Sequence, residues 1–259
     1  MIIGAPYTDP NGQSSAGSSY VVFGSSSGFN ASLNLSFLDG SNGFVINGIN
    51  SGDSSGYSVS SAGDINGDGF DDLIIGASRA SSYSLYGAES SYVVFGRSSG
   101  FNASLNLSSL DGSEGFVINR INNGDRLGTS VSSAGDINSD GFDDLIIGAS
   151  SASPNGQFQA GSSYVVFGRN SGFGAGLDLS DLDGSNGFVI NGINSGDSSG
   201  RSVSSAGDIN GDGIDDLIIG ATRADPNGTF IAGSSYVVFG SSSGFNASLN
   251  LSSLDGSNG

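Results

Sequence analysis

The sequence contains no cysteine, histidine, lysine or tryptophan. Without cysteine there are no disulfides, and without cysteine or histidine a zinc or copper site has none of its preferred ligands. Histidine, cysteine and lysine are also the usual general bases and nucleophiles of enzymes. We therefore expect a protein that is not an enzyme. No apolar run approaches the roughly 20 residues of a membrane span, so we expect no membrane insertion by this segment.

Positive charge is scarce as well. Seven arginines stand against 25 acidic residues, which gives a formal net charge of −18. Nucleic acid is not expected as a partner, because contacts to phosphates need a cationic surface. Twelve of the carboxylates lie in three Asp-rich loops, so the acidity indicates a demand for bound cations.

What the chain has in abundance is glycine, with 45 residues, and internal repetition at a spacing of 72 residues. Self-similarity at a fixed period is typical of repeat architectures. We divide the chain into one partial and three whole repeats: 1–43, 44–115, 116–187 and 188–259. In this register we expect a further Asp-rich loop before Met1 or after Gly259, as in a cut array.

Four short segments in each repeat predict β-strands, and no stretch of ten or more residues has helical periodicity. In the second whole repeat the segments are Phe116–Asn119, Thr129–Ala134, Leu145–Ala149 and Ser163–Gly168. A leucine-containing connection follows, which we expect to form a loop or a short helical turn. The fold prediction is all-β, with propeller-type blades of four antiparallel strands that are incomplete or completed by neighbouring chains. A β-solenoid is the competing arrangement, but 72 residues is long for one coil.

The segment of small residues should form the crowded inner strand of each blade. The apolar strands should pack between neighbouring sheets. The core residues expected there are Ile74, Ile75, Val93, Val94, Phe95, Phe116 and Ile118.

The Asp-rich loop carries oxygen-bearing side chains at positions 1, 3, 5 and 9 and glycine at position 6. Calcium takes six to eight oxygen ligands from carboxylates, amides, backbone carbonyls and water. With the backbone carbonyl of position 7, the predicted ligands are Asp64, Asn66, Asp68, Phe70 and Asp72 in the first loop, Asp136, Asn138, Asp140, Phe142 and Asp144 in the second, and Asp208, Asn210, Asp212, Ile214 and Asp216 in the third. We expect three calcium ions, one in each loop.

Two other interpretations of the loop were weighed. An EF-hand needs a carboxylate at position 12, where this chain has Ile75, Ile147 and Ile219, so a strand must follow the loop. Alternatively, the Asp-Gly and Asn-Gly pairs only mark polar hairpin turns. Three copies with the same ligand positions favour calcium.

The run from Leu127 to Ala149 resembles the FG-GAP repeat of integrin α-subunit β-propellers, and through its copies the resemblance covers essentially the whole chain. Gly4-Ala5-Pro6 matches the GAP element, while the FG element is reduced to Leu127-Gly128 in the second whole repeat. The resemblance implies four-stranded blades, calcium in an inter-strand loop, and a role in extracellular adhesion or matrix. Nearly identical copies are more similar to a bacterial surface repeat array than to an animal receptor.

We therefore expect a calcium-stabilised adhesion or matrix module, extracellular or at the cell surface. Its partner would be a protein or glycan at a surface, or copies of itself. The first alternative is a structural subunit of a surface fibre or sheath, assembled through incomplete blade ends. The second is a propeller lectin, which the absence of tryptophan weakens.

Two minor features remain open. Asp53, Asp125 and Asp197 each follow a glycine, as expected of turn residues, and could also serve as second ligands or surface contacts. The segment from Ser81 to Tyr86 departs in sequence from its copies, and variable loops on a rigid scaffold can carry binding specificity.

Overall fold

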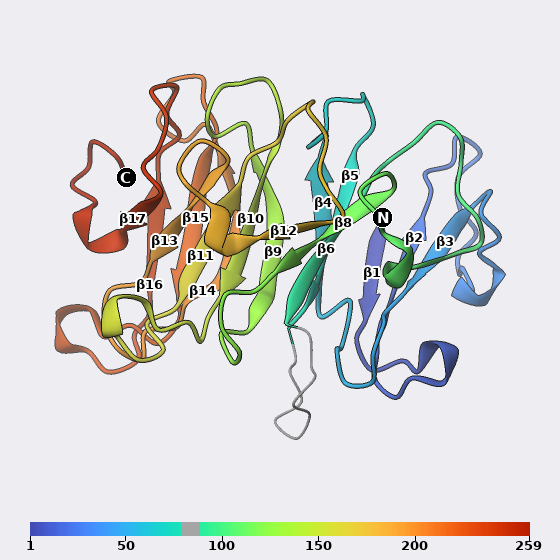
Figure 1. Cartoon of the computed structure of the whole chain (residues 1–259), viewed down its shortest axis with the longest axis horizontal. Helices are drawn as coiled ribbons and strands as arrows, with labels where there is room; N and C mark the ends of the chain where they lie inside the picture. Colours follow the sequence, from blue (N-terminus) through green and yellow to red (C-terminus); the bar gives the residue numbers. More distant parts are fainter. Residues whose placement is uncertain (79–88) are drawn as a thin grey trace.

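The computed structural model describes residues 1–78 and 89–259, which form four β-sheets lying side by side (Figure 1). Within these residues the strands are joined by loops and one-turn 3₁₀-helices, with no α-helix among them. The all-β prediction is confirmed. The variable segment from Ser81 to Tyr86 lies outside the described residues. None of the described helices has the length and apolar character needed to cross a bilayer.

The two central sheets have five strands each. Sheet 2 contains, from its inner edge outward, β4 (Ser58–Gly63), β5 (Asp72–Ala77), β6 (Ser90–Val94), β8 (Gly115–Asn119) and β12 (Gly176–Asp178). Sheet 3 contains β9 (Leu127–Gly135), β10 (Asp144–Ala149), β11 (Ser162–Val166), β13 (Gly187–Asn191) and β17 (Ser248–Asn250). The first four strands of each sheet pair antiparallel, and the fifth pairs parallel.

The two outer sheets are smaller. Sheet 1 contains β1 (Ile2–Ala5), β2 (Ser18–Val22), β3 (Gly43–Asn47) and β7 (Ser104–Asn106). Sheet 4 contains β14 (Ser199–Gly207), β15 (Asp216–Ala221) and β16 (Ser234–Val238). The 3₁₀-helices of the described residues are η1 (Pro10–Gly12), η2 (Leu35–Phe37), η3 (Leu107–Ser109), η4 (Pro154–Gly156), η5 (Leu179–Asp181), η6 (Pro226–Gly228) and η7 (Leu251–Ser253).

The four antiparallel strands predicted for a blade are present in sheets 2 and 3, and a short parallel strand joins each of them as a fifth. β12 and η5 belong to the connection between β11 and β13 of sheet 3, yet β12 pairs with β8 of sheet 2. This connection buries Leu179 in the core that sheets 2 and 3 share, so its backbone lies along the open edge of β8. The connection after the third strand in each of sheets 2, 3 and 4 thus adds a short parallel strand to the preceding sheet.

The sheets are also out of phase with the sequence repeats. Repeat 44–115 begins inside β3, which belongs to sheet 1, and repeat 116–187 begins inside β8, which belongs to sheet 2. Each central sheet therefore takes its inner three strands from one sequence repeat and its fourth from the next.

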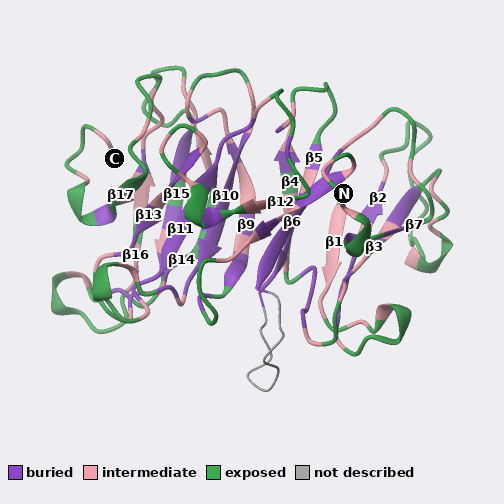
Figure 2. Ribbon diagram, in the orientation of Figure 1, coloured by how far each residue is buried: buried purple, intermediate pink, exposed green. Residues whose placement is uncertain are grey.

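The cores lie between neighbouring sheets, where Figure 2 shows buried strands in the middle of the molecule. All seven predicted core residues are buried. Ile74, Phe116 and Ile118 pack with sheet 3, whereas Ile75 and Val94 pack with sheet 1. The strands after the first two Asp loops, β5 and β10, are apolar on both faces because each face meets another sheet.

The inner strand β9 lies between the inner strands β4 and β14 of the neighbouring sheets. The small residues in these strands predict this close approach. The Val131 N–H donates to Ser58 Oγ at 2.8 Å, and the Val203 N–H donates to Ser130 Oγ at 3.1 Å. Close approach requires glycine here, since a Cβ on Gly76 would overlap the carbonyl oxygen of Gly128 in the next sheet. Glycine and serine thus bring the inner edges of neighbouring sheets together.

Candidate metal centre

The three Asp loops join the inner strand of a sheet to its second strand. Residues 64–71 connect β4 to β5, residues 136–143 connect β9 to β10, and residues 208–215 connect β14 to β15. The predicted ligands at positions 1 to 7 lie in the loop, and the predicted ligand at position 9 is the first residue of the following strand. The expected change from loop to strand after position 8 is therefore present.

Within the first loop, the side chains bond to the backbone of the loop itself. Asp64 Oδ1 accepts from the Asp68 N–H at 3.0 Å, and Asp64 Oδ2 accepts from the Gly69 N–H at 2.8 Å. Asp68 Oδ1 accepts from the Phe70 N–H at 2.9 Å, and Asn66 Oδ1 accepts from the Asp68 N–H at 2.9 Å. The second and third loops repeat these bonds. The turn is thus built by the side chains that were predicted as ligands.

Asp72 ties the loop to the sheet. Its side chain is 0% exposed and accepts from the Ile65 N–H at 3.2 Å and from the Gly96 N–H at 2.7 Å. Burial, together with the nearby Asp68 and Asp64 charges, raises its pKa to about 7. Asp144 is equally buried, and burial, together with Asp140 and Asp136, raises its pKa to about 8. Each carboxylate is costly to ionise, first because it is buried and second because its charged neighbours are acidic.

The residues of each loop fit a hard cation by their chemistry. All the side-chain donors are oxygens, and each carboxylate oxygen named above accepts one backbone bond while having a second lone pair. In the described part of the chain the one ion pair is Arg97–Glu114, so no arginine balances the loop carboxylates there. As the side chains stand, however, no three acidic groups among the described residues are gathered closely enough to hold an ion. The calcium ligands stay a prediction.

Three segments of the chain match one repeat family. Residues 55–94, 127–166 and 199–238 each match the FG-GAP repeat family. The chain contains three FG-GAP repeats. Each matched segment begins at or just before the inner strand of sheet 2, 3 or 4 and ends with the third strand, so an FG-GAP repeat here is three strands with one Asp loop. The resemblance of these segments to the FG-GAP repeat is confirmed.

Similar curated proteins carry the name phosphatidylinositol-glycan-specific phospholipase D. The Mus musculus protein is 35% identical over 120 residues, and the Rattus norvegicus protein is 37% identical over 119 residues. Each match covers 46% of this chain and 14% of the relative. The chain therefore spans only a small part of these relatives.

One residue of the FG-GAP loops was not given a role from the sequence. Asp143, at position 8, reaches the loop of the preceding FG-GAP repeat, where its Oδ2 accepts from the Asp64 N–H at 2.9 Å. Asp215 does the same for the Asp136 N–H at 3.0 Å. The available signal was an aspartate at position 8 of every loop that no predicted ligand set used.

The aspartates in the Gly-Asp turns act within their turns. Asp53 Oδ2 accepts from the Asn50 N–H at 3.0 Å, and Asp197 Oδ2 accepts from the Asn194 N–H at 3.2 Å. These turns lie at the opposite end of the sheets from the Asp loops, because they precede the inner strand of a sheet whereas the Asp loop follows it. The turn interpretation is confirmed.

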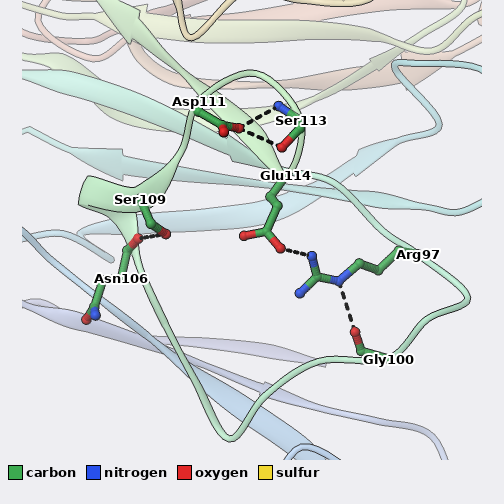
Figure 3. Close-up of polar contacts among 7 residues, drawn as sticks. All are labelled: Arg97, Gly100, Asn106, Ser109, Asp111, Ser113 and Glu114. Carbon is green, nitrogen blue, oxygen red and sulfur yellow. Dashed lines mark hydrogen bonds and ion pairs between the residues drawn. The ribbon is translucent and has the colours of Figure 1, made fainter.

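A polar cluster lies on the connection between β6 and β8 (Figure 3), and among the described residues its Arg97–Glu114 ion pair has no counterpart. Arg97 pairs with Glu114, and its Nε donates to the Gly100 carbonyl oxygen at 2.9 Å. In the first repeat the position of Glu114 is occupied by Asn42, which closes its turn by accepting from the Asp39 N–H. The Arg97 guanidinium also lies 4.6 Å from the centre of the Phe101 ring. The cluster fastens this connection and is separate from the Asp loops.

Proposed function

We propose that this chain is a calcium-stabilised, non-catalytic adhesion or matrix module of an extracellular or cell-surface protein. One observation carries the calcium part of the proposal. Each FG-GAP loop ends on a fully buried carboxylate, Asp72, Asp144 or Asp216, and the side chains placed to approach it are acidic. A divalent cation would stabilise the ionised form of this carboxylate, whereas no arginine of the described residues pairs with it.

The ion would be held by the predicted set in each loop. In the first loop these ligands are Asp64, Asn66, Asp68 and Asp72 through side-chain oxygens, and Phe70 through its carbonyl oxygen. Calcium suits this set better than magnesium, which keeps more water and a smaller octahedral shell. When bound, the ion would offset the repulsion among the carboxylates and join the loop to the start of the second strand.

Two observations support a non-catalytic, extracellular role. The sequence has no histidine, cysteine or lysine to act as base or nucleophile. FG-GAP repeats occur in extracellular or secreted proteins. The phospholipase D relatives share only 14% of their length with this chain, so we assign it an accessory module and not their hydrolytic activity.

Thermal unfolding in calcium and in EGTA tests the proposal. At free calcium about tenfold above Kd, mass action stabilises the folded chain by about 1.4 kcal/mol for each site. Three sites add about 4 kcal/mol, which corresponds to roughly 8–16 °C in Tm for a chain of this size. An equal excess of magnesium should restore much less. Equal melting temperatures in calcium and in EGTA would sink the proposal.

Association between copies of the chain is a second candidate, and one observation favours it. Ile209 is 61% and Ile218 39% exposed in sheet 4, whereas the corresponding residues Ile65 and Ile74 of sheet 2 are 0% exposed. Exposed apolar residues on one sheet favour contact with another apolar sheet. Sedimentation velocity over a hundredfold concentration range checks this candidate. A constant monomer mass would leave a protein or glycan as the proposed partner.

A further inference from the structure

Each Asp loop that is followed by another sheet is partly built by that sheet. The Asp143 side chain accepts from the Asp64 N–H at 2.9 Å, and the Arg169 N–H donates to the Ile65 carbonyl oxygen at 2.8 Å. Both contacts come from sheet 3, although the loop they hold belongs to sheet 2. The next pair of loops has the same two contacts, from Asp215 to the Asp136 N–H and from the Ser241 N–H to the Ile137 carbonyl oxygen.

The surfaces of neighbouring Asp loops also fit each other in shape. Gly63 has a φ of 67°, and a Cβ there would overlap the Asp143 carboxylate. A Cβ on Gly67, at position 4, would overlap the Phe142 ring of the next loop. The second loop has Ser139 at position 4, and there the next loop offers the smaller Ile214 at position 7. Position 4 of the first loop thus fits position 7 of the second, and the next pair of loops combines a larger residue at position 4 with a smaller one at position 7.

The third loop shows what these contacts contribute. No following Asp loop lies against it, and Ile209 is 61% exposed, whereas Ile65 and Ile137 are 0% exposed. A Cβ added to Gly207 would meet no atom within 4 Å, in contrast to Gly63. The local sequence is nearly the same in all three loops, so the difference in burial comes from the neighbouring sheet.

From these contacts we infer that neighbouring Asp loops bind cations cooperatively, with Asp143 and Asp215 as the positioning residues that couple them. The inference rests on the proposed calcium sites. Asp143 stands between Phe142 and Asp144, two predicted ligands of its own loop, so an ion in loop 136–144 would restrain it. The restrained carboxylate then holds the Asp64 N–H, and Asp64 is the first predicted ligand of loop 64–72. By linkage, an ion in loop 64–72 favours binding in loop 136–144 to the same extent.

Calcium titration calorimetry on the full chain, stripped of metal, tests the coupling. Asp212→Ala silences loop 208–216 and leaves two loops, and adding Asp140→Ala leaves only loop 64–72. We expect loop 64–72 to bind about fivefold or more weakly when loop 136–144 is silenced, which is the lower end of typical coupling. In the one-loop background, Asp143→Ala should weaken loop 64–72 about tenfold further, although none of its predicted ligands has changed.

Two variants separate positioning from general effects. Asp183→Ala removes the same charge from an exposed turn, and it should leave calcium affinity within about twofold. Asp143→Asn keeps an oxygen that can accept from the Asp64 N–H, so it should retain more calcium affinity than Asp143→Ala. It also allows the coupling to be measured if the alanine variant fails to fold. Its melting temperature in EGTA should match that of the parent.

Each outcome decides between the two proposals. If the unaltered chain takes up no calcium, the proposed function falls and the coupling falls with it. If calcium binds but loop 64–72 has the same affinity with and without Asp140→Ala, the proposed function stands and the coupling is overturned. Equal losses in Asp143→Ala and Asp183→Ala also overturn it, since general electrostatics would then account for the effect.

Discussion

The packing of the β12 connection against sheet 2 can be tested by deleting one aromatic ring. Phe173 lies on the connection that supplies β12, and it is 7% exposed. Its ring stacks on Phe116 of sheet 2, with centroids 4.4 Å apart and planes 5° apart, and it is tilted against Phe95 at 6.2 Å. The Arg169 guanidinium lies 4.5 Å from the centre of the ring. Phe173→Ala therefore removes a buried ring that joins sheet 3 to sheet 2.

We expect Phe173→Ala to lower the free energy of unfolding by about 3–5 kcal/mol, the usual cost of deleting a buried phenylalanine side chain. This is a large part of a typical total of roughly 5–15 kcal/mol. Phe29 occupies the same position in the partial repeat and is 65% exposed. Phe29→Ala should change stability by no more than about 0.5 kcal/mol.

Urea unfolding followed by circular dichroism, in the same calcium buffer, measures both variants. Equal m-values are required for the comparison, because a changed m-value indicates a changed unfolded or native state. The reasoning is refuted if the two variants differ by less than about 1 kcal/mol. In that case the connection would lie on the preceding sheet without stabilising it.

Two further predictions concern the Asp loops. In EGTA, the pKa of Asp144 is about 8 in the folded chain and near 3.8 when unfolded. The folded state therefore holds a proton that the unfolded state has lost, and Tm should fall as pH rises from 6 to 8. Calcium should reduce this fall because it favours the ionised carboxylate, and a Tm in EGTA that rises with pH would contradict the assignment. Separately, Gly67→Ser should lower Tm by several degrees because its side chain meets Phe142, and adding Phe142→Ile should recover most of the loss, since the next pair of loops combines Ser139 at position 4 with Ile214 at position 7. A double variant no more stable than Gly67→Ser would disprove the match between positions 4 and 7.

Much of the fold follows from local patterns in the sequence. Strands such as β10 are short apolar runs bounded by glycine and Asp turns, and the inner strands are built from small residues that allow close approach. The Asp loop ends where position 9 begins a strand, because the apolar run starts there. Burial of Ile74 and Ile75 on opposite faces also follows, since a strand apolar on both faces needs a sheet on each side.

The tertiary structure alone decided which residues of different repeats meet. β12 pairs with β8 of the preceding sheet, and no pattern within either segment indicates that pairing. Asp71, Asp143 and Asp215 are the same residue at the same loop position. Asp143 and Asp215 each hold a loop 79 residues away, whereas Asp71 faces no Asp loop in the described structure. The reason is physical: a local pattern determines the conformation of a segment, but the contacts of its outward side chains depend on which sheet lies beside it.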